Sequence, residues 1–276
     1  MTDRYAVIGN PVAHSKSPFI HAEFARQTGQ DIVYERILAP LEGFRSAVQD
    51  FRAEGGKGLN VTVPFKLEAF QIANQRGLRA EEAEAVNTLK FEGATIYGDN
   101  TDGIGLSRDI QANLGCHLAG RDILLMGAGG AAQGALGRLL DAGPARVVIA
   151  NRTVDKAERL AQRFRAARSL AAEALSASGY AELSGQQFDI VVNSTSASLD
   201  DTVLDLPDGL FARDSLAYDM MYGKGMTPFL EMALAQGAGR CADGLGMLVE
   251  QAAESFFIWR GVRPQTGQVI EALKAR

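Results

Sequence analysis

The sequence predicts an α/β fold with two domains, and three observations support this prediction. The chain has 276 residues, which is long for a single small core and suits two domains of ordinary size. Short apolar strand patterns alternate with helical patterns along most of the chain, as in βαβ units with a parallel sheet. One strand pattern, residues 123–126, runs directly into a glycine-rich turn and a helix of small residues, which is typical of a Rossmann-like nucleotide-binding domain.

The first hundred residues predict a domain with its own sheet. Strand patterns occur at residues 5–9, 32–38, 58–63, 86–91 and 95–98. One helix is expected to start at Ser17, as an N-cap before Pro18, and another after Pro64. A third is predicted over residues 40–51, where apolar side chains recur at helical spacing: Leu41, Phe44, Val48 and Phe51.

The turn-rich segment 99–103 marks the expected change of domain. Beyond it, strands are predicted at residues 123–126, 146–150, 188–192 and 215–219, and helices at 104–114, 156–167 and 228–236; for 171–187 only a short helix is expected. A long amphipathic helix from Leu245 to Trp259 is expected to pack on the first domain. The predicted domains are therefore residues 1–101 plus 240–276, and residues 102–239.

Composition excludes several classes of protein. The net charge of −5 argues against a nucleic-acid-binding surface, which would be basic. The two cysteines, Cys116 and Cys241, have no metal-binding spacing, which favours a reducing cytoplasm and no structural zinc. The N-terminal residues show no secretory signal pattern, and no segment approaches the ~20 apolar residues of a membrane span.

The glycine-rich turn begins at Gly127, directly after its strand pattern. Gly127 permits a tight turn, and Gly129 lets the backbone approach a pyrophosphate closely. Ala131 and Ala132 are small enough for the following helix to pack on the strand. Because the first N–H groups of a helix lack partners within it, this N-terminus offers donors and a positive dipole end to the anion.

The next strand pattern ends in Asn151, Arg152 and Thr153. NAD-binding sites place an acidic residue near this position for the ribose 2′-hydroxyl, and no Asp or Glu occupies this segment. Arg152, with Lys156 one helical turn further on, fits a 2′-phosphate, which a carboxylate would repel. The pattern therefore favours NADP over NAD; the alternative is that Arg152 is a solvated residue at a strand end.

Two hydroxyl residues, Ser15 and Ser17, stand at a predicted strand-to-helix turn. Beside a helix N-terminus, such a pair makes a neutral anion site suited to a carboxylate. Ser17 is alternatively only the N-cap, or serves both purposes. His14 and His21 lie close by in the sequence, and we interpret both as structural or exposed rather than catalytic.

A second polar cluster begins at Asn60. Strand alternation puts Asn60 and Thr62 on one side of a strand. Lys66 then falls in the first turn of the next helix, where a cation opposes the helix dipole; this favours a functional role, against the alternative of a solvated lysine. Asn87 and Asp102 stand in two further polar clusters. A lysine and an aspartate in one pocket can deliver the proton that reduction of a ketone requires.

With these motifs identified, the chain resembles the shikimate dehydrogenase family in its NADP-dependent type. The resemblance runs nearly from end to end. The motifs that carry it are Gly9-Asn-Pro, Ser15-Lys-Ser17-Pro18, Asn60-Val-Thr-Val-Pro-Phe-Lys66, Ala85-Val-Asn87-Thr88, Gly98-Asp-Asn-Thr-Asp102-Gly103, Gly127-Ala-Gly-Gly-Ala131, Asn151-Arg-Thr153, Tyr218-Asp-Met220 with Tyr222, and Ala242-Asp-Gly-Leu-Gly-Met-Leu248 with Gln251.

The resemblance implies a discontinuous N-terminal substrate domain, a Rossmann-like NADP-binding domain, and a cytoplasmic oxidoreductase. Its reaction would be the reversible NADPH-dependent reduction of 3-dehydroshikimate to shikimate, in the shikimate pathway to chorismate and the aromatic amino acids. The partners implied are these small molecules, with no nucleic acid, membrane or metal, in a monomer or homodimer.

The resemblance also implies site residues. Lys66 is the implied acid/base and Asp102 orients it, while Ser15 and Ser17 hold the substrate carboxylate. The full implied substrate-binding set is Ser15, Ser17, Thr62, Lys66, Asn87, Asp102, Tyr222 and Gln251. The implied cofactor-binding set is Gly127, Ala128, Gly129, Gly130, Ala131, Asn151, Arg152, Thr153, Lys156, Met220 and Gly244.

One segment departs from the family pattern. After the strand at 188–192 the chain reads Asn193-Ser-Thr-Ser-Ala-Ser198, with Ser198 where the family usually has glycine. The wall of the cofactor site is therefore expected to differ locally.

Two other functions remain as alternatives. An NAD-dependent quinate/shikimate dehydrogenase would share the fold, but Arg152 and Thr153 argue against it. A non-catalytic dinucleotide sensor could keep the glycine-rich turn and lose the acid/base pair. The presence of both Lys66 and Asp102 favours an enzyme.

Overall fold

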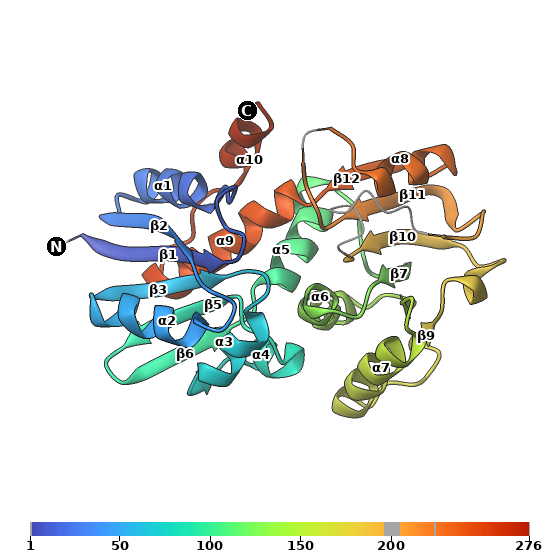
Figure 1. Cartoon of the computed structure of the whole chain (residues 1–276). Coiled ribbons are helices and arrows are strands. Elements are labelled where there is room, and N and C mark those ends of the chain that lie inside the picture. The colour runs from blue at the N-terminus through green and yellow to red at the C-terminus, as the bar shows by residue number, and fades with distance from the viewer. Residues whose placement is uncertain (1, 196–204, 224, 276) are drawn as a thin grey trace. The chain divides into compact units, whose positions relative to one another are not determined.

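The computed structural model describes residues 2–195, 205–223 and 225–275, and it confirms the α/β fold (Figure 1). The chain forms two compact units. Unit 1 comprises Met1–Gly105 and Leu248–Arg276, and unit 2 comprises Leu106–Met247. Unit 1 is discontinuous because the chain leaves it through α5 (Asp102–Arg108) and returns through α9 (Leu245–Arg260).

Unit 1 contains a mixed sheet in the order β2-β1-β3-β5-β6-β4. Its strands are β1 (Asp3–Gly9), β2 (Ile32–Leu38), β3 (Gly56–Val61), β4 (Gln75–Arg76), β5 (Thr88–Glu92) and β6 (Thr95–Asp99). β1 is parallel to β2 and β3, and β5 is antiparallel to β3 and β6. The carboxyl ends of β1, β3 and β6 therefore share one edge of the sheet with the start of β5.

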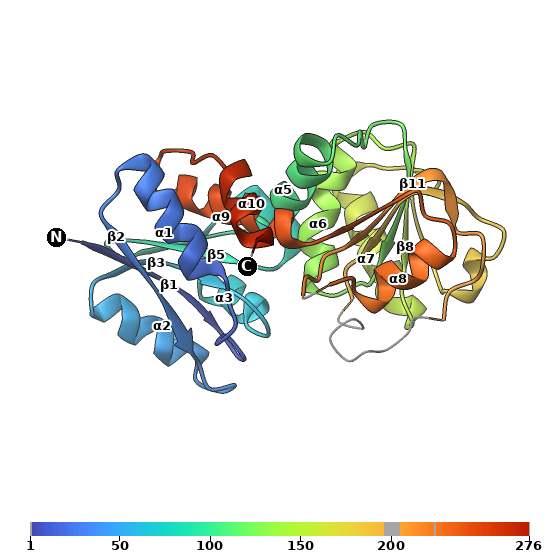
Figure 2. The ribbon, with the colours of Figure 1, turned by 90° about the horizontal axis from the view of Figure 1, so that it is seen from above.

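Helices cover both faces of this sheet (Figure 2). They are α1 (Ser17–Thr28), α2 (Phe44–Ala53), α3 (Lys66–Ile72), α4 (Leu78–Ala83), α9 and α10 (Gly267–Lys274). Because strand side chains alternate, Ile8 and Leu59 pack with α2 residues on one face, while Tyr5 faces the other and stacks on Trp259 of α9 at 4.6 Å.

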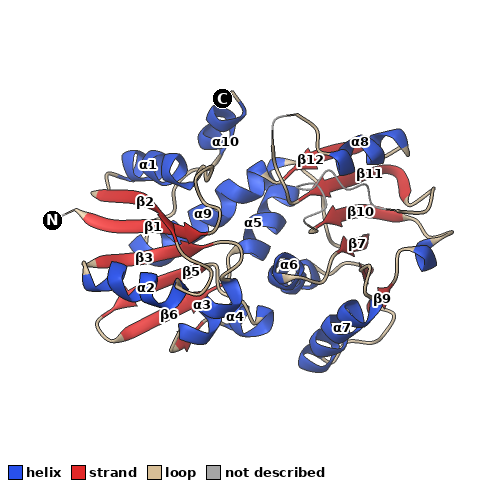
Figure 3. Ribbon diagram, in the orientation of Figure 1, coloured by secondary structure: helices blue, strands red, loops and turns tan. Residues whose placement is uncertain are grey.

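Unit 2 contains a parallel sheet in the order β12-β11-β10-β7-β8-β9. Its strands are β7 (Asp122–Met126), β8 (Arg146–Ala150), β9 (Leu175–Ser178), β10 (Phe188–Asn193), β11 (Phe211–Asp219) and β12 (Arg240–Asp243). α6 (Gly130–Asp141) and α7 (Val154–Arg168) cover one face, and α8 (Pro228–Ala235) covers the other (Figure 3). This is the doubly wound order, whose direction reverses between β7 and β10.

The connection into unit 2 changes helix type. The predicted helix at 104–114 is present as α5 followed by a π-helical turn, Asp109–Asn113. Among the described residues, none of the helices combines the length and the apolar character needed to cross a membrane.

Several local predictions were wrong. Ser17 is not an N-cap: Lys16 holds that position, and the Ser15 hydroxyl accepts the Ser17 N–H instead. Leu41 is 64% exposed, because a turn closed by Gly43 N–H and Pro40 C=O precedes α2. The edge strands β9 and β12 were missed, since they are short and largely polar and form only by pairing with β8 and β11.

Candidate functional site

Lys66 and Asp102 form an ion pair at the shared edge of the unit 1 sheet. Lys66 begins α3 just after β3, and Asp102 begins α5 just after β6. Lys66 Nζ donates to Asp102 Oδ2 at 2.5 Å, and the two side chains are 21% and 7% exposed. The pairing of a nearly buried carboxylate with an accessible ammonium group holds a proton donor in a fixed place.

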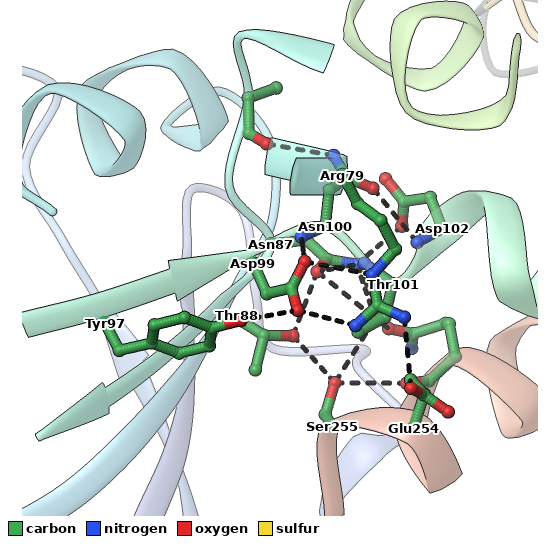
Figure 4. Close-up of polar contacts among 12 residues, drawn as sticks. Arg79, Asn87, Thr88, Tyr97, Asp99, Asn100, Thr101, Asp102, Glu254 and Ser255 are labelled. Atoms are coloured by element: carbon green, nitrogen blue, oxygen red, sulfur yellow. Dashed lines mark hydrogen bonds and ion pairs between the residues drawn. The ribbon is translucent and has the colours of Figure 1, made fainter. Parts of the chain in front are cut away.

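The second oxygen of Asp102 is held by Asn87, which precedes β5 (Figure 4). Asn87 Nδ2 donates to Asp102 Oδ1 at 2.8 Å. Asn87 Oδ1 accepts the Thr101 N–H at 2.9 Å, which fixes the orientation of the amide. Gln251 of α9 reaches the same cluster, because its Oε1 accepts from Thr101 Oγ1 at 3.3 Å. Both oxygens of Asp102 therefore have defined partners.

Asp99, a buried residue at the end of β6, is bound by Arg79 and by the backbone of Asn100 next to this cluster (Figure 4). Arg79 of α4 binds Asp99 through two hydrogen bonds of 3.0 and 2.5 Å, and also donates to Glu254 at 3.1 Å. Asp99 Oδ1 accepts the Asn100 N–H at 2.8 Å, and Asn100 Oδ1 accepts the Asp102 N–H at 3.1 Å. These contacts fix the backbone between the end of β6 at Asp99 and the start of α5 at Asp102. No sequence pattern indicated a role for Arg79.

Ser15 lies on the loop between β1 and α1, and Ser17 is the first residue of α1. Ser15 Oγ accepts the Ser17 N–H at 3.3 Å, and Arg36 of β2 donates two hydrogen bonds to the Ser15 carbonyl, at 3.1 and 2.6 Å. The Ser17 hydroxyl lies near Tyr34, where it partly opposes the rise in the Tyr34 pKa that burial causes. The loop is therefore anchored by its backbone.

Polar contacts join the serine loop to the Lys66 cluster. Tyr34 donates to Asn60 Oδ1 at 2.8 Å, and Asn60 Nδ2 donates to the Asn87 carbonyl at 3.3 Å. Thr62 follows β3 on the loop leading to Lys66 and is partly exposed. Tyr222 belongs to unit 2. Of the residues implied for substrate binding, unit 1 thus gathers seven along one sheet edge: Ser15, Ser17, Thr62, Lys66, Asn87, Asp102 and Gln251.

The glycine-rich turn of unit 2 follows β7 at the point where the strand order reverses. Gly127 has φ of 103°, and a Cβ there would lie 2.7 Å from Ser194 Oγ. Gly129 is the N-cap of α6, with no side-chain cap. A Cβ at Gly129 or Gly130 would meet nothing within 4 Å, so this side of the turn is open. The first N–H groups of α6 therefore face an accessible anion site, which fits a pyrophosphate.

The residues after β8 lie beside this turn, because β7 and β8 are adjacent and parallel. Asn151 Nδ2 donates to the Thr153 carbonyl at 2.9 Å and shapes the loop before α7. Arg152, Thr153 and Lys156 are exposed. Residues 151–153 contain no carboxylate, and the first one, Asp155, follows in the first turn of α7. The two cations, Arg152 and Lys156, fit a phosphate group on the ribose.

Of the segment that departs from the family pattern, residues 193–195 lie within the described part of the chain. Ser194 Oγ donates to the Met126 carbonyl at 2.5 Å, and Thr195 donates to Asn193 Oδ1 through both its N–H and its hydroxyl. Ser194 therefore packs against the glycine-rich turn. Ser198 lies outside the described residues.

The sequence did not reveal a buried polar pair at the ends of β10 and β11. Asp219 Oδ1 accepts from Asn193 Nδ2 at 3.1 Å and from the Met221 N–H at 3.0 Å, and its Oδ2 accepts from Thr227 at 2.6 Å. These bonds fix the turn that carries Met220 and Tyr222. Gly244 N–H donates to the Met221 carbonyl at 3.0 Å from the neighbouring strand end. The sequence did carry one signal for this pair: Asp219 is a charged residue at the end of the apolar run 216–218.

No three His, Cys, Asp or Glu residues lie close enough to share a metal ion within residues 2–195, 205–223 and 225–275.

Comparison with known proteins covers nearly the whole chain. Residues 7–89 match the shikimate dehydrogenase substrate binding domain, residues 109–201 match the shikimate / quinate 5-dehydrogenase family, and residues 244–274 match the shikimate 5'-dehydrogenase C-terminal domain.

Individual relatives match over their full length. The shikimate dehydrogenase (NADP(+)) of Dechloromonas aromatica is 58% identical, over 100% of this chain and 99% of its own. An Ael1 enzyme from Pseudomonas putida has 53% identity and a TM-score of 0.91, over 99% of this chain and 98% of its own. The shikimate 5-dehydrogenase of Thermus thermophilus, solved with NADP(H) and shikimate, has 32% identity and a TM-score of 0.87, over 99% of both chains. On this evidence, the chain belongs to the shikimate dehydrogenase family.

Proposed function

We propose that this protein is an NADP-dependent shikimate dehydrogenase, which reversibly reduces 3-dehydroshikimate to shikimate on the route to chorismate and the aromatic amino acids. The observation that carries the proposal is the Lys66–Asp102 pair, 2.5 Å apart, within the gathered polar residues of unit 1. Membership of the family supports the same activity.

Reduction of the ketone needs a hydride at the carbonyl carbon and a proton at the carbonyl oxygen. NADPH supplies the hydride when it is bound. Lys66 Nζ donates the proton to the oxygen as it gains negative charge, which leaves a neutral amine on the lysine. In the reverse reaction the neutral amine accepts the proton from the hydroxyl. Asp102 holds the ammonium group by charge and by a hydrogen bond, so the proton is presented from one direction.

The remaining polar residues bind and orient the substrate. Ser15 and Ser17 donate to its carboxylate, with Tyr222 nearby. Thr62, Asn87 and Gln251 contact the ring substituents together with Asp102. Uncharged donors at the carboxylate leave Lys66 as the cation nearest the reacting carbonyl, which keeps its proton directed there.

Unit 2 holds the cofactor. Gly127, Ala128, Gly129, Gly130 and Ala131 receive the pyrophosphate at the start of α6. The 2′-phosphate is bound by the segment after β8, through Asn151, Arg152, Thr153 and Lys156. Met220 and Gly244 would contact the nicotinamide. The open side of the turn at Gly129 and the two exposed cations support this assignment.

We place the enzyme in the cytoplasm, as a monomer or homodimer. The thiols of Cys116 and Cys241 are free, which fits a reducing compartment. Size-exclusion chromatography with light scattering distinguishes the two oligomeric states.

A single set of assays tests the function. The absorbance of reduced nicotinamide is followed with shikimate or quinate, each with NADP⁺ or NAD⁺. We expect the highest kcat/KM for shikimate with NADP⁺. A higher value with NAD⁺ supports the quinate/shikimate dehydrogenase alternative instead. Binding of the dinucleotide without any turnover supports the non-catalytic sensor.

A further inference from the structure

His21 occupies a fully buried position in α1 that the proposed reaction does not use. Its ring stacks on Tyr34 at 4.2 Å with an interplanar angle of 7°, and Trp259 lies 5.3 Å away. His21 Nε2 lies 3.1 Å from Asn60 Oδ1, and Nδ1 has no hydrogen-bond partner within the described part of the chain. Burial lowers the pKa of His21 to about 3, so the ring stays neutral at physiological pH.

The neighbours of Asn60 determine which ring nitrogen carries the hydrogen. Asn60 Nδ2 faces the Asn87 carbonyl at 3.3 Å and Ser255 Oγ at 2.9 Å. A flipped amide would place its oxygen against that carbonyl, with two acceptors in contact. Asn60 Oδ1 therefore faces His21 and accepts a hydrogen bond from Nε2–H. The ring is the Nε2–H tautomer.

Asn60 also connects the two parts of the candidate substrate site. Its Oδ1 accepts a second hydrogen bond from the Tyr34 hydroxyl at 2.8 Å. Tyr34 in turn lies near Ser17, whose hydroxyl partly opposes the rise in the Tyr34 pKa that burial causes. On the other side, its Nδ2 donates to the Asn87 backbone. A buried path of hydrogen bonds therefore runs from Tyr34, which neighbours the proposed carboxylate-binding Ser17, through Asn60 to Asn87, which holds Asp102.

We propose that His21 is a positioning residue for substrate binding. Its Nε2–H, donated to Asn60, fixes the amide that joins Tyr34, the neighbour of Ser17, to the backbone of Asn87. His21 exchanges no proton during the reaction and does not touch the substrate. This inference rests on the proposed function, because it takes Ser17 and Asn87 to bind the same substrate molecule.

The variants separate the hydrogen bond from the packing. His21→Phe keeps an aromatic ring and removes the donor, whereas His21→Gln keeps an N–H donor. Phe24→Leu is the matched packing control: Phe24 is buried on the same helix, its ring edge lies against His21, and it takes no part in the hydrogen-bond path. Steady-state kinetics are measured for shikimate and for NADP⁺.

We expect His21→Phe to raise the KM for shikimate about 10-fold, as for loss of a buried hydrogen bond in a binding site, with kcat changed less than about 3-fold. The KM for NADP⁺ stays within about 2-fold. His21→Gln restores the KM for shikimate to within about 3-fold of wild type, and Phe24→Leu leaves it unchanged. The inference is wrong if His21→Phe leaves this KM within about 2-fold, or if Phe24→Leu raises it equally.

A measurement on the wild-type protein does not depend on any variant folding. Nitrogen-15 NMR of the histidine rings reports protonation and tautomer. We expect the His21 signals of a neutral ring with hydrogen on Nε2 at both pH 8 and pH 5. A charged ring at pH 5, or hydrogen on Nδ1, overturns the inference even if the enzyme is active. Absence of wild-type turnover instead contradicts the proposed function and leaves the NMR result to decide the hydrogen bond.

Discussion

Lys66 Nζ and Asp102 Oδ2 lie 2.5 Å apart although the two residues are separated by 36 positions in the sequence. Each begins a helix at the same edge of the unit 1 sheet, because β3 and β6 end there. An ion pair built on two helix starts and braced by Asn87 is held more rigidly than one between loop side chains.

Replacing Lys66 tests the proton donor. We expect Lys66→Ala to lower kcat by roughly 10²–10⁴-fold, since it removes the proposed proton donor, while shikimate still binds. Steady-state assays give kcat, and calorimetry gives binding. Lys57→Ala is the control, because Lys57 is exposed on β3. An unchanged kcat in Lys66→Ala removes this residue from its proposed role.

Arg152 is expected to select the cofactor. Arg152→Ala removes a cation from the proposed 2′-phosphate site, so kcat/KM for NADP⁺ falls by roughly 10–100-fold, as for a lost charge-assisted hydrogen bond. The value for NAD⁺ changes little, since NAD⁺ lacks this phosphate. Arg159→Ala, at an exposed position of the following helix α7, serves as the control. Equal losses for both cofactors contradict the assignment.

Gly127 is expected to tolerate no side chain. Its φ of 103° and the 2.7 Å separation between an added Cβ and Ser194 Oγ both oppose Gly127→Ala. Gly143 also has positive φ, at 69°, but a Cβ there meets nothing within 4 Å. We expect Gly143→Ala to cost about 1 kcal/mol of unfolding free energy and Gly127→Ala about 2–4 kcal/mol, measured by urea denaturation. If the two variants lose the same unfolding free energy, Ser194 moves away from the added Cβ without cost and the prediction is wrong.

Arg79 is expected to stabilise unit 1 by pairing with buried acids. The side chains of Asp99 and Glu254 are 4% and 7% exposed. Arg79→Met leaves Asp99 without its charged partner, which costs about 3–5 kcal/mol in a buried pair. Arg76→Met is the control, because Arg76 pairs with the exposed Glu81 and is expected to cost ~1 kcal/mol or less. Urea denaturation gives the unfolding free energy of both variants. If Arg79→Met loses no more of it than Arg76→Met, the prediction is wrong.

His21 is expected to make the protein sensitive to acid. Its pKa is about 3 in the folded protein and about 6.5 in the unfolded chain. As pH falls below about 6.5, the unfolded chain binds a proton that the folded protein does not, so the free energy of unfolding decreases until pH reaches about 3. The slope from this group is at most about 1.4 kcal/mol per pH unit.

The test compares urea unfolding at pH 7 and pH 5. We expect His21→Gln to lose less stability over this interval than wild type. His14→Gln is the control, because it replaces a histidine that is exposed rather than buried. Identical losses in wild type and His21→Gln show that His21 titrates normally in the folded protein.

The sequence alone identified the parts of the fold that depend on local patterns. The apolar run before Gly127 and the small residues after it indicated a strand, a tight turn and a helix, because these preferences lie in the residues themselves. The resemblance to the family, which the motifs around Lys66 and Asp102 help to carry, implied that Asp102 orients Lys66, and the two side chains form an ion pair. The strands β9 and β12 carry no such pattern and were missed.

The partners of buried polar side chains depend on residues far apart in the chain, and only the tertiary structure decides them. His21 and Asn60 are 39 positions apart, and Asn60 and Ser255 are 195 apart. A buried polar group takes whichever partners the folded chain brings to it, so its role is undetermined before folding. Local periodicity and backbone preference therefore determined most elements and their order. Long-range packing decided that His21, which the sequence led us to interpret as structural or exposed, is buried against Asn60 next to the candidate substrate site.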